Sequence, residues 1–461
     1  MGHRNRARRG PNGRFRTLHA PHVWWTRFPS PYRENAEYPK RPTPSNRRIV
    51  KATTSKPTMN HTRTLAGLIG LSALALTGLS QAQQLYPTVE AKLKPTADNF
   101  YTSPSTSELT SVTPGTVLRY RALPAGSLST NLKEGWQLMY RSNNNKNLPV
   151  AMVTTVLIPK SVPATGRKLL SYQAFYDSLT LDCSPSGQAT SNALLEKTFF
   201  NSALNKGYIV TMADYEGLES QWIVARNSAH GVLDGIRATL RFTKAGLNAT
   251  TPVGMLGYSG GGFATGWAAE YAPSYAPELK IVGAAEGGLP VNPINVAKKV
   301  DGTFWAGAYI GAVVGLSRGY PEINVEDYAT PAGVEAVKDA GTRCLTGFPN
   351  LLTAYAYKNG TDYYKDPNFL DLPVMQAINR ENTMGQFTPK IPLHIFQSIG
   401  DQLMPIADVD NLVATYCARG VKVEYKRVWG TDHVIGALGM GGGLTYLLDR
   451  FDGKAVPNTC K

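Results

Sequence analysis

The sequence predicts an α/β fold in which a mainly parallel central sheet carries an inserted, mostly helical cap. Short apolar runs alternate with helix-like sequence from residue 169 onward, an order typical of parallel sheets with helices on both faces. A long helix-like stretch between the last two runs breaks this alternation. We therefore expect a core formed by residues 83–290 and 386–461, with a helical cap at 291–385.

The first 58 residues are predicted to be a basic extension. They carry +12 of the formal net charge of +15 and contain few aliphatic side chains, a composition that cannot offset the entropy of ordering. We interpret residues 1–58 as disordered sequence upstream of the true start, with a genuine basic tail as the alternative. Because the basicity belongs to this extension, it does not indicate a nucleic-acid partner.

Residues 59–82 have the organisation of a signal peptide. A short basic start precedes 15 uncharged residues, 65–79, and then small residues that end at Ala82. The uncharged run is too short to span a bilayer comfortably, and cleavage after Ala82 makes Gln83 the first mature residue. We therefore expect a secreted protein, extracellular or periplasmic, with no stable membrane span.

The strand-like segments of the mature chain fall into two groups. Residues 116–121 and 136–141 alternate in polarity and 150–158 form an apolar run, so the sheet is predicted to open with antiparallel strands. The later runs each precede helix-like sequence and predict parallel strands. They are residues 169–174, 208–212, 253–257, 281–285 and 393–397.

Four cysteines remain in the mature chain, where export permits disulfides. None lies in a Cys-x-x-Cys pair and the mature histidines lack ligand spacing, so we expect no metal and no cofactor. Two disulfides are the simplest interpretation, and the spacing leaves three pairings open. The cysteines are Cys183, Cys344, Cys417 and Cys460.

The candidate nucleophile is Ser259, at the centre of the Gly-x-Ser-x-Gly segment 257–261. An apolar strand runs into this segment and small residues run out of it as a helix, the arrangement that exposes a serine in α/β-hydrolases. The alternative is a glycine-rich turn of structural use. A second match surrounds Ser317, but it follows a helical stretch with no strand before it.

His433 is the candidate base, because in this fold the base follows the serine and lies near the C-terminus. It occupies a polar loop that contains glycine. His394 lies within an apolar strand and is better interpreted as a core histidine. His230 precedes the serine on a helix, where a structural hydrogen bond is expected.

Asp401 is the candidate acid that orients the base. It follows the strand predicted at 393–397 through a glycine turn, the position at which an α/β-hydrolase presents this group. Asp432 is adjacent to His433 in the chain, which usually directs the two side chains apart. We therefore assign Asp401 and not Asp432.

Several further segments occur in a fixed order along residues 98–460. They are 114–120, 171–178, 207–217, 230–237, the Ser259 segment, and 401–405 followed by His433. Together they resemble the secretory lipase family, the yeast lipase A type with bacterial members. By that resemblance the catalytic residues fall on Ser259, Asp401 and His433, and the oxyanion hole falls on Asp177 and Gly260.

The resemblance also implies disulfides from Cys183 to Cys344 and from Cys417 to Cys460. One residue departs from the pattern: Glu286 introduces a charge where small or neutral side chains are expected near the acyl site.

The chemistry predicted is hydrolysis of carboxylic esters of the lipid or triacylglycerol type through an acyl-enzyme, on a small-molecule substrate that can lie at a lipid interface. The alternatives are a hydrolase of non-lipid esters or amides on the same scaffold, since fold does not fix substrate, and a non-catalytic binding protein. The complete Ser-Asp-His set argues against the last.

The cap is expected to line the acyl-chain pocket. Residues 304–316 are apolar and interrupted by glycine, and Ala308 and Gly311 are expected to leave room for the chain. The alternative is a buried helix of the core.

Overall fold

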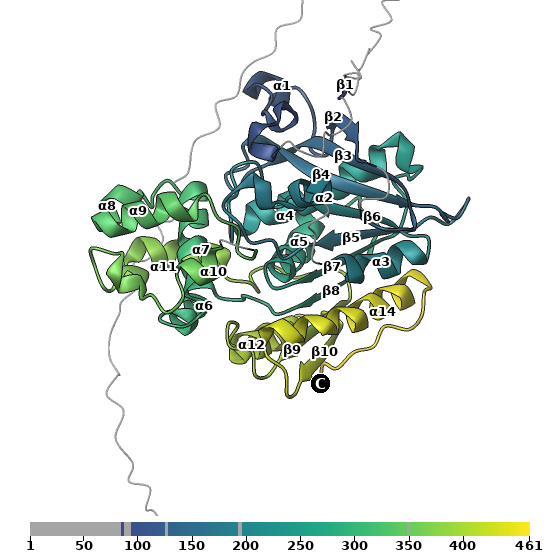
Figure 1. The fold of residues 1–461 in the computed structure, drawn as a ribbon. Helices are drawn as coiled ribbons and strands as arrows, with labels where there is room; N and C mark the ends of the chain where they lie inside the picture. Colours follow the sequence, from purple (N-terminus) through teal and green to yellow (C-terminus); the bar gives the residue numbers. More distant parts are fainter. Residues whose placement is uncertain (1–83, 87–93, 125–127, 192–195, 348–349) are drawn as a thin grey trace, which may run out of the picture. The chain divides into compact units, whose positions relative to one another are not determined.

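A ten-stranded sheet runs through the part of the chain that this computed structural model describes, residues 84–461 with gaps at 87–93, 125–127, 192–195 and 348–349 (Figure 1). Its strand order is β1-β2-β3-β4-β6-β5-β7-β8-β9-β10. The extension predicted at 1–58 and the signal peptide predicted at 59–82 lie outside the described residues.

The first half of the sheet is mainly antiparallel. The long strands β3 (Leu132–Asn143) and β4 (Pro149–Pro159) pair with each other, and β3 also pairs antiparallel with β2 (Val117–Ala122). The predicted antiparallel opening is therefore confirmed. A short strand β1 (Gln84–Leu85) adds to β2 in parallel and was not predicted.

The second half of the sheet is parallel. All five predicted strands are present, and within this half each strand pairs in parallel with the strand beside it. Its strands are β5 (Leu169–Gln173), β6 (Ile209–Ala213), β7 (Val253–Tyr258), β8 (Ile281–Gly287), β9 (Leu393–Ser398) and β10 (Val423–Val428). The sequence analysis missed β10, because this edge strand is partly exposed and charged and lacks an apolar run.

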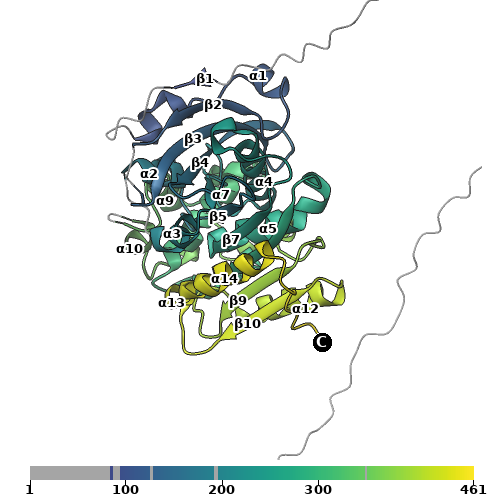
Figure 2. The same cartoon turned by 90° about the vertical axis from the view of Figure 1, so that its right-hand side faces the viewer.

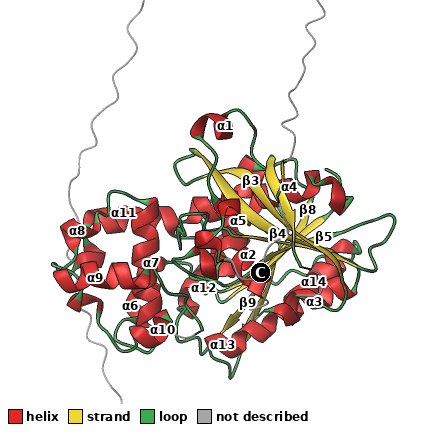
Figure 3. Ribbon diagram, turned by 45° about the horizontal axis from the view of Figure 1, so that its top comes forward, coloured by secondary structure: helices red, strands yellow, loops and turns green. Residues whose placement is uncertain are grey.

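Helices cover both faces of the sheet (Figures 2 and 3). On one face α4 (Ala225–Arg241) packs against α5 (Gly260–Tyr275), and their apolar side chains share a core with α12 (Ile406–Ala418). On the other face α3 (Lys197–Asn205) and α14 (Met440–Phe451) bury a separate core. Three shorter helices are α1 (Thr106–Thr110), α2 (Pro185–Ser191) and α13 (His433–Gly436).

The helices between β8 and β9 gather beside the sheet (Figures 1 and 3). Among the described residues this segment contains no strand, only two isolated bridges. Its helices are α6 (Pro293–Val300), α7 (Ala306–Gly319), α8 (Val325–Tyr328), α9 (Pro331–Ala340), α10 (Leu351–Ala354) and α11 (Pro373–Asn382). The central helix α7 contacts α6, α9 and α10.

Two disulfides join distant parts of the chain. Cys183, after β5, is bonded to Cys344, after α9, and Cys417 of α12 is bonded to Cys460. Both pairings implied by the family resemblance are confirmed.

Candidate active site

Ser259 lies in the tight turn between β7 and α5. Its backbone is left-handed, with φ 55° and ψ −124°, and its N–H donates to Gly287 O of β8 at 2.9 Å. A Cβ on Gly257 would collide with the carbonyl of Gly261, and one on Gly261 would collide with Gln173 of β5. The glycines therefore allow the close backbone approach that this strained turn requires.

The structure brings Ser259, His433 and Asp401 together from three separate strand ends. His433 Nε2 lies 2.9 Å from Ser259 Oγ, and His433 Nδ1 lies 2.8 Å from Asp401 Oδ2. All three side chains are buried. This arrangement can transfer a proton from the serine hydroxyl to the imidazole while the carboxylate holds the ring.

The surroundings of Asp401 favour its charged form. Its Oδ1 accepts from the backbone N–H groups of Leu403 and Met404, at 2.9 and 2.8 Å, and its Oδ2 also accepts from Gln397 at 2.9 Å. Burial raises the pKa of Asp401, but the hydrogen bonds from His433 and the two N–H groups outweigh burial and leave the pKa below its ordinary value.

The residues rejected at the sequence level have other partners. Asp432 caps α13 by accepting from Ile435 N at 2.7 Å, and His394 Nδ1 contacts Glu424 at 2.8 Å. His230 donates through Nδ1 toward backbone carbonyls at 3.3 Å. Ser317 lies inside α7 and donates to Val314 O at 2.7 Å.

Asp177 lies directly against Gly260, the residue after the nucleophile. A Cβ on Gly260 would collide with the Asp177 carboxyl, so this carboxyl lies against the backbone at the start of α5. Burial raises the pKa of Asp177 to about 7, although nearby His433, and after it Gly260 and Trp222, lower the pKa. Asp177 has a positive φ of 36° and leaves Oδ1 without a partner among the described residues.

Two further acids anchor the loop that carries Asp177, and the sequence analysis missed both. Glu196 Oε1 accepts from Phe175 N at 3.2 Å, and Glu216 Oε2 accepts from Ser178 N at 3.3 Å. Both carboxyls are buried. One signal was present in the sequence, since Glu216 follows the strand ending at Ala213, and strand ends of this kind carry site residues in parallel sheets.

Glu286 is fully buried between β8 and α5, with its carboxyl beside Gly266. Burial, with Glu270 nearby, raises the pKa of Glu286 to about 8. The sequence analysis noted Glu286 as an ionisable side chain where small or neutral residues were expected, and a pKa near 8 favours its neutral form at pH 7.

The glycines of α7 do not provide space for a substrate. A Cβ on Gly311 would collide with the Trp222 ring, and one on Gly315 would lie 2.6 Å from Trp222 Cβ. The glycines therefore let α7 pack closely on Trp222, and the expectation that Gly311 leaves room for an acyl chain is wrong. Another face of α7, with Ile310 and Val313, lines an apolar cavity among the helices between β8 and β9.

Exposed apolar side chains lie close to His433 along the chain. Trp429, Val434, Ile435 and Leu438, here called the His433 rim, are 81, 61, 49 and 71% exposed. Trp429 lies on the loop after β10, Val434 and Ile435 lie on α13, and Leu438 lies on the following 3₁₀ helix η7 (Ala437–Gly439). Apolar groups so exposed and so close together mark contact surfaces.

Neither a metal-binding group nor a membrane-spanning helix is present in the described part of the chain. No cluster of three or more His, Cys, Asp or Glu side chains there is arranged to hold a metal ion. None of the helices in these residues is both long and apolar enough to cross a bilayer.

Comparison with known proteins shows extended similarity. The family model of the secretory lipases matches residues 184–458. Lipase A of Arthroderma benhamiae is 35% identical over 396 residues, 81% of this chain and 83% of that protein. The trichothecene C-3 esterase of Fusarium sporotrichioides is 34% identical and covers 77% of this chain and 82% of its own length. The structure of Candida antarctica lipase A aligns with a TM-score of 0.75 at 31% identity, over 80% of this chain and 89% of that one.

Proposed function

Because this chain belongs to the secretory lipase family, we propose that it is a secreted serine hydrolase that cleaves carboxylic esters of lipids. The observation that carries the proposal is the hydrogen-bonded series Ser259, His433 and Asp401, with distances of 2.9 and 2.8 Å. Two disulfides fit an oxidising, extracytoplasmic location.

The reaction begins when Ser259 Oγ attacks the ester carbonyl carbon and its proton moves to His433 Nε2. Asp401 holds the ring through Nδ1 and stabilises the imidazolium. The tetrahedral intermediate then collapses as His433 gives the proton to the departing alkoxide, which leaves as the alcohol and an acyl-enzyme. Water, deprotonated by His433, attacks the acyl-enzyme and releases the acid and free Ser259.

The negative charge on the carbonyl oxygen needs donors already aimed at it. The backbone N–H of Gly260, at the first turn of α5, is one such donor. The second is the backbone N–H of Asp177, which lies against Gly260 and makes no backbone hydrogen bond with a described residue. We assign the oxyanion hole to these two groups.

The lipid character of the substrate is supported by the His433 rim. A water-insoluble ester must reach Ser259 from a lipid surface, and the rim offers apolar side chains beside the base. We assign segment 291–385 to a cap beside the sheet. Its helices enclose two apolar cavities, and neither cavity is lined by Ser259 or His433.

Hydrolysis by the purified mature protein tests the proposal. Wild-type protein should hydrolyse p-nitrophenyl butyrate and emulsified tributyrin, and Ser259→Ala should lose both activities while keeping its thermal unfolding temperature. Covalent labelling by a phosphonate ester should modify Ser259 alone. Activity that survives in Ser259→Ala would exclude this mechanism.

Non-lipid esters form the second candidate substrate class. One relative is named trichothecene C-3 esterase, so the names of this chain's relatives are not restricted to lipases. A rate that rises with acyl length from acetate to octanoate favours the lipid assignment. A rate that is highest for acetate and falls with chain length favours the second class.

A further inference from the structure

Asp177 has an unfavourable backbone conformation in the loop after β5. Its φ of 36° lies in the left-handed region, which a residue other than glycine keeps only where surrounding contacts fix the backbone. The backbone N–H that we assign to the oxyanion hole belongs to this residue. The contacts that fix the loop on either side of Asp177 therefore determine where that N–H points.

Glu216 contacts both chain neighbours of Asp177. Its backbone N–H donates to the Tyr176 hydroxyl at 2.8 Å, and its carboxyl Oε2 accepts from the backbone N–H of Ser178 at 3.3 Å. Both hydrogen bonds are buried, and Glu216 itself is 0% exposed. One residue thus holds the strained position from both sides.

The segment that carries Glu216 is a firm support for this loop. It follows β6, which pairs in parallel with β5. The Tyr215 hydroxyl donates to Ala174 O at 2.7 Å, and the Tyr215 ring lies 4.9 Å from the Tyr176 ring between centroids. Glu216 therefore extends a set of contacts that already joins the ends of two adjacent strands.

The Glu216 carboxyl makes one hydrogen bond, to the loop of Asp177. Its Oε1 has no partner among the described residues, so its burial costs free energy that a single hydrogen bond does not offset. Burial, with Asp177 nearby, raises the pKa of Glu216 well above its ordinary value. The position thus requires one acceptor oxygen on a neutral side chain, and the amide of glutamine offers the same acceptor.

We propose that Glu216 is a positioning residue for acyl transfer, which holds Tyr176 and Ser178 so that the backbone N–H of Asp177 between them faces the oxyanion. This inference rests on the proposed function. It deepens that function because it assigns the alignment of the oxyanion hole to an acid that acts on the loop and not on the substrate.

The role predicts an effect on turnover and little effect on binding. The negative charge exists only in the transition state and the intermediate, so alignment of its donors changes kcat much more than KM. Loss of a whole oxyanion donor costs about 10²–10³ in kcat, so loss of its support should cost less, roughly tenfold. A thionoester responds less, because sulfur accepts hydrogen bonds weakly.

Glu216→Ala is the test, because it removes the acceptor for Ser178 N–H, and Glu216→Gln restores an acceptor. On p-nitrophenyl butyrate the kcat of Glu216→Ala, per active site titrated with the phosphonate, should fall roughly tenfold, with KM within about twofold. On the analogue with sulfur in place of the carbonyl oxygen, kcat should fall by less than about threefold. Glu216→Gln should recover the wild-type kcat on both substrates.

Tyr176→Phe removes the other hydrogen bond and deletes only a hydroxyl group, so it keeps the packing of the ring. It should also lower kcat on the oxygen ester more than on the thionoester. Glu270→Ala is the matched control. Glu270 is 2% exposed on α5 and accepts from the backbone N–H groups of Gly385 and Phe387 at 2.6 and 2.8 Å. This variant should unfold at a lower temperature and keep the wild-type kcat per titrated site.

Three results would overturn the inference. They are wild-type kcat in Glu216→Ala or Tyr176→Phe, equal losses on the oxygen ester and the thionoester in either variant, and a Glu216→Gln enzyme as slow as Glu216→Ala. The proposed function fails separately, if Ser259→Ala stays active or the phosphonate labels another residue.

Discussion

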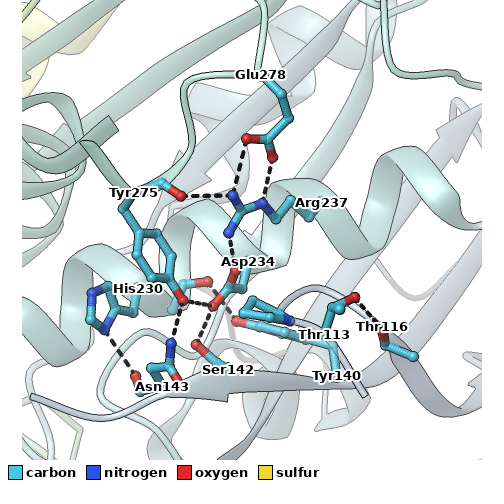
Figure 4. A network of polar contacts seen from close by, with 12 residues as sticks. Thr113, Thr116, Tyr140, Ser142, Asn143, His230, Asp234, Arg237, Tyr275 and Glu278 are labelled. Carbon is cyan, nitrogen blue, oxygen red and sulfur yellow. Dashed lines mark hydrogen bonds and ion pairs between the residues drawn. The ribbon is translucent and has the colours of Figure 1, made fainter. Parts of the chain in front are cut away.

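Two buried aspartates, Asp234 and Asp401, each accept several hydrogen bonds, but their partners differ. The partners of Asp234 only connect elements of the fold, whereas one partner of Asp401 contacts Ser259. Asp234 is on α4, is 0% exposed, and accepts from Arg237 at 2.8 Å and from Ser142 and Tyr275 at 2.7 Å (Figure 4). Its partners connect β3, α4 and α5. Asp401 has four donors, and one of them, His433, contacts the nucleophile.

The comparison teaches that a complete set of donors does not distinguish a structural carboxylate from one that orients a base, the role proposed for Asp401. In the Asp234 network Arg237 also pairs with Glu278 at 2.6 Å (Figure 4), so one guanidinium holds both carboxyls within the network. At Asp401 the charge is aimed at a base whose second nitrogen faces a hydroxyl. The role of each buried aspartate therefore depends on what its hydrogen-bond donor contacts next: Glu278 for Arg237, and Ser259 for His433.

Asp401→Asn should have the largest effect. The amide presents the wrong hydrogen-bond pattern to His433 Nδ1, and kcat on p-nitrophenyl butyrate should fall by several orders of magnitude, about 10⁴ in the serine protease precedent. The unfolding temperature should change little, since the neighbouring N–H groups keep an oxygen acceptor. Retained turnover would mean that Asp401 is as structural as Asp234.

Asp234→Asn should give the opposite result. It leaves the half-buried Arg237 with Glu278 as its remaining counter-charge and directs an amide at existing donors, so the free energy of unfolding should fall by about 3 kcal/mol. Denaturant unfolding measures that loss, and kcat per folded molecule should stay at the wild-type value. A loss of kcat without a loss of stability would remove the distinction between the two aspartates.

Unlike Asp234 and Asp401, the buried carboxyl of Glu286 accepts no hydrogen bond from a described residue. Neither of its oxygens has a partner among the described residues, and burial raises its pKa to about 8. Between its ordinary pKa and pH 8 the folded state binds a proton that the unfolded state has lost. Stability is therefore full at low pH and falls as pH rises toward 8.

Glu286→Gln removes this proton linkage and keeps the shape of the side chain. The variant should unfold at the same temperature as wild type near pH 5 and several degrees higher near pH 8, as scanning calorimetry can measure. Glu326→Gln, at an exposed residue of α8, is the control and should follow wild type at both pH values. A Glu286→Gln curve parallel to wild type would mean that the carboxyl is charged in the fold.

The features predicted from the sequence, namely the parallel strands and the three candidate catalytic residues, depend on motifs and their order along the chain. Ser259, Asp401 and His433 each follow a strand of the parallel half, so the triad could be assigned from motif, strand and chain order together. The other strands of this half were recognisable from their short apolar runs. Strand β10 was not, because its charged residues suit an exposed edge.

What the sequence did not predict depends on contacts between distant segments. Glycine spacing in α7 is compatible with a pocket or with close packing, and only the ring of Trp222, far away in the chain, decides between them. The protonation of Glu286 likewise follows from burial beside Gly266 and Glu270, which no spacing pattern indicates.

The smallest effect is expected at Asp432, the acid adjacent to the base. Its carboxyl caps α13 by accepting from Ile435 N at 2.7 Å, and asparagine caps helices as well as aspartate does. Asp432→Asn should therefore leave both kcat and the free energy of unfolding nearly unchanged, whereas Asp432→Ala should lose about 1 kcal/mol of stability. Parallel kinetic and denaturant measurements on the two variants separate these outcomes. A loss of kcat in Asp432→Asn that approached the loss in Asp401→Asn would transfer the orienting role to Asp432, because the cap interaction survives in that variant and only the charge is removed.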